Sequence, residues 1–217
     1  MFTSGKSQRA HFTGKRPLFY YITDTGKITG SAFYACIRRA LKWGVDFIQI
    51  REKQMPDSDL FELTLRIVKL ARNTECRILV NGRADIARVA GAHGVHLPSD
   101  SLRVTDLRSW LPNNFIIGKS VHSKNEAARA RAEGADYLLL GHLFPTPSKS
   151  GYGPHLGLDY LRRVCYGSPV PVFGLGGISA DRIESVLDSG AAGVAGISLF
   201  QNRSNFNDLK KRYPSRP

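Results

Sequence analysis

Short apolar runs alternate along the chain with segments whose apolar residues recur at helical spacing. The runs are rich in β-branched and aromatic residues, which is the pattern typical of buried strands. They span residues 18–23, 45–51, 77–81, 94–97, 115–121, 136–141, 170–175 and 192–198. Between them, Phe33, Ile37 and Leu41 fall on one helical face, and the apolar residues of 60–70 repeat this pattern. The sequence therefore predicts strands that alternate with helices.

This alternation predicts an α/β fold, a single (β/α)8 TIM barrel. Strand–helix–strand units place parallel strands in one sheet through right-handed crossovers. Eight such units within residues 18–200 favour a closed barrel over an open doubly wound sheet. We expect a helix start at Asp57 or Ser58, a second after Ser179 with Gly190 at its end, and a short helix over 85–92. Residues 1–17 form a basic N-terminal tail, and residues 201–217 a C-terminal helix with a basic tail.

The positive charge of the chain gathers at its two ends. The 217 residues include 31 Lys and Arg against 18 Asp and Glu, a net charge of +13. Such a charge ordinarily raises nucleic acid as a partner. Each terminal segment carries +4, however, which leaves +5 for residues 18–200 and does not favour nucleic acid. We interpret the ends as solvated tails, with organellar targeting by the first 16 residues as the weaker alternative.

The remaining composition is that of a soluble globular protein. No apolar run approaches the length of about 18 residues that a membrane span needs. Cys36, Cys76 and Cys165 lack CxxC spacing, which argues against a disulfide framework and against a cysteine zinc site. We expect a cytoplasmic protein without a membrane partner, and the sequence leaves a homo-oligomer open.

In a TIM barrel the chemistry lies at the carboxyl ends of the strands. Gln49, Arg51 and Lys53 alternate at the end of the second predicted strand, so an extended backbone would point all three the same way. An Arg fork and a Lys charge suit a phosphate or a carboxylate. The alternative is that Arg51 forms a structural bridge with Glu52 or Asp24. Polar or glycine residues also end the other predicted strands: Thr23, Asn81, Arg83, His96, Ser120, His122, His142, Gly176, Gly177 and Ser198.

Two glycine-containing strand ends predict a phosphate site. Gly176 and Gly177 follow the seventh predicted strand, and Ile197 and Ser198 follow the eighth. Backbone N–H groups after these two strands commonly bind phosphate in TIM barrels. The loop at 144–153 holds two prolines, two glycines and Lys149, and we interpret it as a lid over an anion or, alternatively, as an ordinary surface loop.

Three histidines end adjacent predicted strands. His96, His122 and His142 would surround one pocket, but they lack metal-binding spacing and a neighbouring acid, so zinc is disfavoured. An imidazole, whose ordinary pKa is near 6.5, both accepts and returns protons at neutral pH. His122 is the best candidate for a general acid/base, and the alternative for each histidine is a hydrogen-bonded structural role.

Several strings of this sequence resemble the thiamine phosphate synthase/TenI superfamily. They are YITD at 21–24, QIREK at 49–53, GVHL at 94–97, TPSK at 146–149, LGGI at 175–178 and GVAGIS at 193–198. The resemblance runs from about residue 18 to residue 200. It implies a (β/α)8 barrel in thiamine biosynthesis.

The superfamily has two branches, and the resemblance separates them. Synthases join a pyrimidine diphosphate to a thiazole phosphate with Mg²⁺, which is held by one Asp in an Asn-Asp-Arg motif and another in a Gly-Gln-x-Asp motif. Here Gly82 and Ser101 occupy these two positions, with Asp100 one position away. Because Mg²⁺ prefers carboxylate oxygens, the loss of both makes the metal-assisted reaction doubtful.

Other strings resemble the TenI branch, the thiazole tautomerases: NGRADIA at 81–87, SVHS at 120–123 and GHLF at 141–144. This resemblance implies that a proton shift through His122 aromatises a thiazole carboxylate phosphate, with no cofactor or metal. The loops at 176–177 and 197–198 would bind the phosphate, with Arg51 and Lys53 or Lys149 near the carboxylate.

Two alternatives stay open. The TPSK lid and the pair Gln49 and Lys53 are more synthase-like, which favours residual diphosphate affinity and keeps a synthase with an altered Mg²⁺ site as the first alternative. A non-catalytic regulatory or phosphate-binding barrel is the second.

Overall fold

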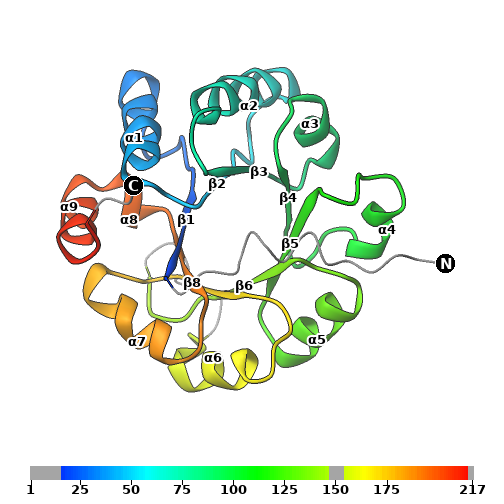
Figure 1. Ribbon diagram of the computed structural model, residues 1–217, viewed down its shortest axis with the longest axis vertical. Helices are drawn as coiled ribbons and strands as arrows, with labels where there is room; N and C mark the ends of the chain where they lie inside the picture. Colours follow the sequence, from blue (N-terminus) through cyan, green and yellow to red (C-terminus); the bar gives the residue numbers. More distant parts are fainter. Residues whose placement is uncertain (1–15, 147–153, 215–217) are drawn as a thin grey trace.

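Eight parallel strands close into one barrel in the computed structural model, which describes residues 16–146 and 154–214. Each strand pairs with the next, and the last pairs with the first (Figure 1). The strands are β1 (Leu18–Ile22), β2 (Phe47–Ile50), β3 (Arg77–Asn81), β4 (Gly94–Leu97), β5 (Ile116–Val121), β6 (Tyr137–Gly141), β7 (Val172–Leu175) and β8 (Gly193–Gly196). Each lies within one predicted run, which confirms the TIM barrel.

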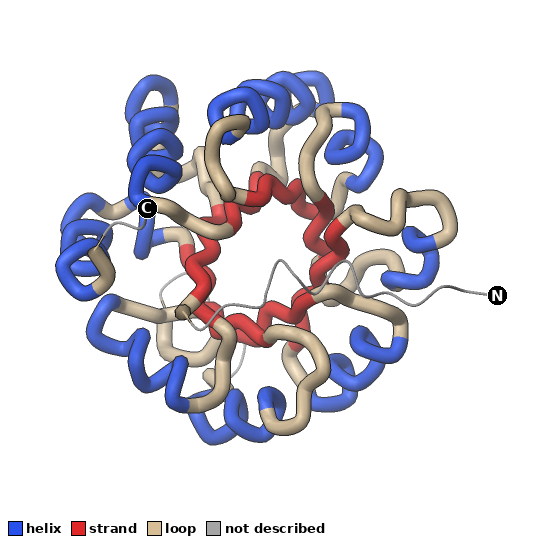
Figure 2. The backbone as a smooth tube through the Cα atoms, viewed as in Figure 1, coloured by secondary structure: helices blue, strands red, loops and turns tan. Residues whose placement is uncertain are grey.

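Helices surround this barrel on the outside (Figure 2). They are α1 (Gly30–Trp43), α2 (Asp57–Ala71), α3 (Ala84–Val89), α4 (Val104–Arg108), α5 (Lys124–Ala132), α6 (Gly157–Cys165), the 3-10 helix η3 (Ala180–Arg182), α7 (Ile183–Asp188), α8 (Ser198–Gln201) and α9 (Arg203–Arg212). The prediction of Asp57 or Ser58 as the cap of α2 is wrong, because Pro56 is the cap and Asp57 lies in the first turn. Proline suits that position because it has no N–H to leave unpaired.

The alternation of side chains along each strand builds two separate cores. On β1, Phe19 and Tyr21 pack outward against the helices, whereas Leu18, Tyr20 and Ile22 belong to the cluster inside the barrel. Because successive residues of a strand point to opposite faces, strands covered on both faces need apolar residues at nearly every position. This explains why the predicted strands read as continuous apolar runs.

Four aromatic rings fill the middle of the barrel. Tyr20, Phe47, Tyr137 and Phe173 contact one another, with ring centroids 5.6–6.2 Å apart. Gly118 makes room for this cluster, since a Cβ there would lie 1.9 Å from Cζ of Tyr137. The interior is therefore a packed core, and open space for a ligand is confined to its ends.

The C-terminal segment packs against the barrel. Phe206 and Leu209 of α9 are fully buried, and the Trp43 indole donates to the Tyr213 carbonyl oxygen at 2.9 Å. The segment 201–217, interpreted as a C-terminal helix with a basic tail, therefore contains a helix, α9, that packs against the barrel. The predicted N-terminal tail lies outside the described residues apart from Arg16 and Pro17. In the part of the chain that is described, no helix has the length and apolarity to cross a membrane.

Candidate active site

Four adjacent strands place polar side chains inside the barrel near its carboxyl end. Gln49 and Asn81 follow the inward-facing residues Phe47 and Leu79 by two positions. Ser120 follows Ile116 of β5 by four, and His96 occupies β4 between them. The Gln49 amide donates to Oδ1 of Asn81 at 3.3 Å. Three of the predicted substrate-binding residues are thereby arranged along one side of the barrel mouth. The strand order β2 to β5 can be followed in Figure 1.

His96 connects this polar layer to the aromatic core. Its Nδ1 lies 2.9 Å from the Tyr137 hydroxyl, which lies 2.8 Å from the Tyr20 hydroxyl, and its Nε2 lies 2.8 Å from Oγ of Ser120. Burial, with smaller contributions from Lys119 and Arg51, lowers the pKa of His96 to about 3. The imidazole is therefore neutral at physiological pH, and both of its nitrogen atoms form hydrogen bonds inside the barrel.

No sequence pattern indicated the two tyrosines of this network. Tyr20 and Tyr137 read as ordinary apolar strand residues. The available signal was general: a buried tyrosine hydroxyl requires a hydrogen-bond partner. Two inward-facing tyrosines on β1 and β6 therefore indicate that a polar partner lies inside the barrel.

His122 follows β5 directly, and its side chain is exposed at the mouth. Its Nδ1 lies 2.5 Å from the carbonyl oxygen of Gly141 on the adjacent strand β6, and its backbone N–H donates to the Glu126 carboxylate at 2.8 Å. Because a carbonyl oxygen only accepts, Nδ1 carries the hydrogen. In the neutral ring, Nε2 then holds a lone pair that is available to a ligand.

Arg51 has no acid partner among the residues that the structure describes. Glu52 instead accepts from the Thr25 N–H at 2.8 Å and from the Thr23 hydroxyl at 2.5 Å, and Asp24 pairs with Lys27. No ion pair of Arg51 occurs within residues 16–146 and 154–214. The predicted structural bridge from Arg51 to Glu52 or Asp24 is therefore not formed, and the guanidinium can bind an anion.

Lys53 lies farther out than its neighbours. Strand β2 ends at Ile50, and residues 53–55 form a turn in which the Met55 N–H donates to the Glu52 carbonyl. The extended geometry that would align Lys53 with Gln49 thus stops before it. Lys53 is exposed.

Gly176 and Gly177 form a left-handed turn after β7. Their φ angles are +96° and +66°, a region that favours glycine. A Cβ on Gly177 would lie 2.7 Å from the Pro145 carbonyl oxygen, so the turn also packs closely on the segment after β6.

The predicted phosphate donors lie in this turn and after β8. Ile197 precedes α8, and Ser198 is its first residue and is exposed. The N–H groups of Gly177 and Ser198 make no hydrogen bond to any other described residue. Unpaired N–H groups at turns and helix starts suit an anion. Lys149, the predicted lid cation, falls outside the described residues.

The positions of the synthase carboxylates do not fit a magnesium ion. Gly82 has no side chain, Asp100 is exposed, and Oγ of Ser101 lies 3.3 Å from the Lys119 ammonium group. A cation beside the second position opposes binding of another cation. The part of the chain that is described contains no cluster of three or more His, Cys, Asp or Glu side chains that could hold a metal.

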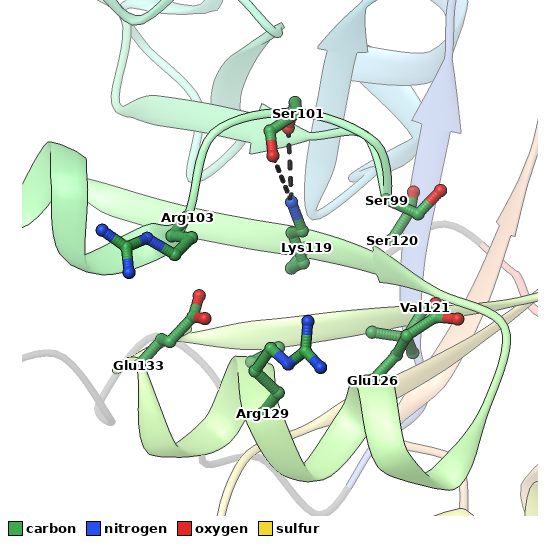
Figure 3. Close-up of a pocket in the computed structure, with 10 residues that line it drawn as sticks. Ser99, Ser101, Arg103, Lys119, Ser120, Val121, Glu126, Arg129 and Glu133 are labelled. Atoms are coloured by element: carbon green, nitrogen blue, oxygen red, sulfur yellow. Dashed lines mark hydrogen bonds between the residues drawn. The ribbon is translucent and has the colours of Figure 1, made fainter.

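A second pocket lies on the outer side of β5, as Figure 3 shows. Lys119 precedes Ser120 and points to the opposite face, where its ammonium group donates to the Leu102 carbonyl oxygen at 3.1 Å and contacts Ser101. Arg129 of α5 lines the other wall. Burial lowers the pKa of Lys119. This lysine ties the loop after β4 to the barrel wall.

The fold and the mouth together define a TIM barrel suited to small anionic ligands. An exposed imidazole, an unpaired guanidinium and a glycine turn lie at the carboxyl ends of its strands, where barrel enzymes carry out their chemistry. A family model described as thiamine monophosphate synthase matches residues 19–200, and the chain belongs to this family of thiamine-biosynthesis enzymes.

Relatives agree with this assignment over most of their length. The thiamine-phosphate synthase of Methanoculleus marisnigri is 39% identical over 179 residues, which are 82% of this chain and 85% of the relative. That of Methanoregula boonei is 39% identical over 198 residues, 89% of this chain and 91% of the relative. Among solved structures, the thiamine phosphate pyrophosphorylase of Pyrococcus furiosus superposes with a TM-score of 0.79 at 32% identity, covering 89% of this chain and 94% of that one.

Proposed function

We propose that this protein is a thiazole tautomerase, which aromatises a thiazole carboxylate phosphate by moving a proton between two carbon atoms. The observation that carries the proposal is the orientation of His122. Its Nδ1–H is held by the Gly141 carbonyl oxygen, which leaves the Nε2 lone pair of the neutral ring available to a ligand. A reaction that needs only one proton taken and returned is suited to a single such group, which contributes about 10²- to 10⁴-fold in rate.

In this reaction His122 takes a proton from a saturated carbon of the non-aromatic tautomer. The electron pair of that C–H bond enters the ring system as it becomes aromatic, and the imidazolium returns the proton to a second carbon. Substrate and product have the same composition, so no co-reactant is needed. Arg51 and the turn at Gly176 and Gly177 would bind the carboxylate and the phosphate and keep the carbon atoms next to Nε2.

The second candidate is a thiamine phosphate synthase, and the names of the relatives favour it. That reaction displaces diphosphate from a pyrimidine with Mg²⁺ in the family. The Gly82 and Ser101 positions, with Lys119 beside the latter, argue against it in this chain.

Two assays on the purified full chain separate the candidates. We expect conversion of the thiazole tautomer to continue in EDTA, and we expect no Mg²⁺-dependent thiamine phosphate from pyrimidine diphosphate and thiazole phosphate. His122→Ala should lose the conversion while still binding thiazole phosphate. Formation of thiamine phosphate, or full conversion by His122→Ala, would reject the tautomerase assignment.

A further inference from the structure

We propose that Tyr137 is a positioning residue that fixes the tautomer of His96 and thereby reserves the Ser120 hydroxyl hydrogen for an acceptor atom of the bound anionic substrate. Tyr20, whose buried hydroxyl contacts the Tyr137 hydroxyl, supports this role. The inference rests on the proposed function only in locating the ligand at the mouth. The tautomer itself is a property of the free protein.

The direction of the hydrogen bonds follows from the innermost group. Tyr20 is completely buried, and within the described residues its hydroxyl contacts only the Tyr137 hydroxyl, at 2.8 Å. A buried hydroxyl hydrogen without an acceptor is strongly disfavoured. Tyr20 therefore donates to Tyr137.

Tyr137 must then donate to His96. Its oxygen accepts from Tyr20, and Nδ1 of His96 lies 2.9 Å away. Since the neutral imidazole has one N–H and Nδ1 accepts, the hydrogen resides on Nε2. Nε2 lies 2.8 Å from Oγ of Ser120, so His96 donates to Ser120.

These hydrogen-bond directions determine the role of the Ser120 hydroxyl. Its oxygen is the acceptor for His96, and its own hydrogen stays available at the half-buried mouth. The reverse direction would make Ser120 donate inward and leave the Tyr20 hydrogen without an acceptor in the core. The network thus turns Ser120 into a donor of fixed direction, suited to a carboxylate, phosphate oxygen or ring nitrogen.

The neighbouring residues are arranged to permit this network. A Cβ at Gly118 would lie 2.3 Å from the Tyr137 hydroxyl oxygen, so only glycine lets that hydroxyl lie below His96. The two rings stack with centroids 5.7 Å apart. The glycine two positions before Ser120 on β5 is therefore part of the same construction.

The first test reads the His96 tautomer by ¹⁵N NMR of the imidazole in the ligand-free full chain at neutral pH. We expect the Nε2–H form in the native protein and in Tyr20→Phe, where the Tyr137 hydroxyl still donates to Nδ1 of His96. Tyr137→Phe should give a mixture of both tautomers. An Nδ1–H form in the native protein, or an unchanged tautomer in Tyr137→Phe, would overturn the proposal whatever reaction the protein catalyses.

The second test is a double-mutant cycle on kcat/KM for tautomer conversion. Ser120→Ala should lower it roughly 10-fold, Tyr137→Phe about 3- to 10-fold, and the double variant no further than Ser120→Ala. Tyr21→Phe is the matched control, since the hydroxyl of Tyr21 on the outer face of β1 is also buried but lies outside the network of Tyr20, Tyr137 and His96. Additive losses, or an equal loss in Tyr21→Phe, would assign Tyr137 a merely structural role.

Discussion

The two sides of the barrel mouth are built for different chemistry. At the ends of β5 and β6, an exposed imidazole is oriented by a backbone carbonyl, and a serine is oriented by a buried histidine. At the ends of β3 and β4, position 82 is glycine and position 101 is serine, whose hydroxyl contacts the Lys119 ammonium group. The first side can hold and return a proton, whereas the second lacks the converging carboxylates that a magnesium ion requires.

The family fold alone therefore does not decide the reaction. One barrel can present a proton-transfer group on one side and a metal on the other, and a few strand-end residues determine which is complete. The relatives are named as synthases, while the residues of this mouth favour proton transfer. Variants on the two sides of the mouth therefore test which of the two reactions the protein catalyses.

Removing the Nε2 lone pair of His122 at the β5 side should reduce activity most. In His122→Asn the amide can still donate to the Gly141 carbonyl oxygen, but nothing replaces Nε2. We expect kcat for tautomer conversion to fall about 10²- to 10⁴-fold, with the fold retained by circular dichroism. An active His122→Asn would mean that the interaction with Gly141, rather than Nε2, is what the reaction needs.

The next effect contrasts one glycine from each side. Gly118→Ala would drive a Cβ into the Tyr137 ring, and we expect a loss of about 3 kcal/mol or more in the free energy of unfolding. Gly82→Ala meets no atom closer than Cδ of Pro98 at 4.0 Å, so only its left-handed backbone, with φ +71°, opposes the change, at about 1 kcal/mol. Urea unfolding of both variants measures the contrast, and equal losses would contradict it.

Acid should lower the free energy of unfolding through His96 of β4, whose Nε2 lies 2.8 Å from Oγ of Ser120 on β5. Its pKa is about 3 in the folded protein and near the ordinary 6.5 when unfolded, so between these values the unfolded chain binds one more proton. The contribution is fully present above pH 6.5 and is lost as pH falls, by at most about 1.4 kcal/mol per pH unit. Replacing His96 with Gln should remove about 2 kcal/mol of the stability loss between pH 6 and pH 4 in urea titrations. An unchanged pH dependence would mean that His96 is protonated in the fold.

The strands and His122 could be predicted from the sequence, whereas the tyrosine network could not. The eight strands follow from local apolar runs, and the placement of His122 follows from the rule that strand ends meet at one mouth. The network of Tyr20 and Tyr137 depends on which inward residues of β1, β4, β5 and β6 meet across the barrel, and that register is not encoded in any local pattern. The alignment of Lys53 with Gln49 required an extended backbone beyond the predicted run at 45–51. That backbone is not formed, because Glu52 turns toward Thr23 and Thr25.

Restoring carboxylates at positions 82 and 101 of the β3–β4 side should have the smallest effect. The backbone at Gly82 is left-handed, where Asp is better tolerated than most residues, and there is space for its side chain. An Asp at 101 would meet the Lys119 ammonium group, which lies 3.3 Å from Oγ of Ser101, and would pair with it before binding a metal. We therefore expect Gly82→Asp with Ser101→Asp to leave Mg²⁺ affinity nearly unchanged in calorimetry. Adding Lys119→Met should tighten it about tenfold.

The matched control carries Asn at 82 and 101 together with Lys119→Met, which keeps the shape but not the charge. It should bind Mg²⁺ no better than the native chain, because neutral amides supply too little charge for this ion. If the native chain already bound Mg²⁺ as tightly as the Asp variant with Lys119→Met, the β3–β4 side would be a working metal site. The difference between the two sides would then disappear, and the synthase reaction would become the better reading of this barrel.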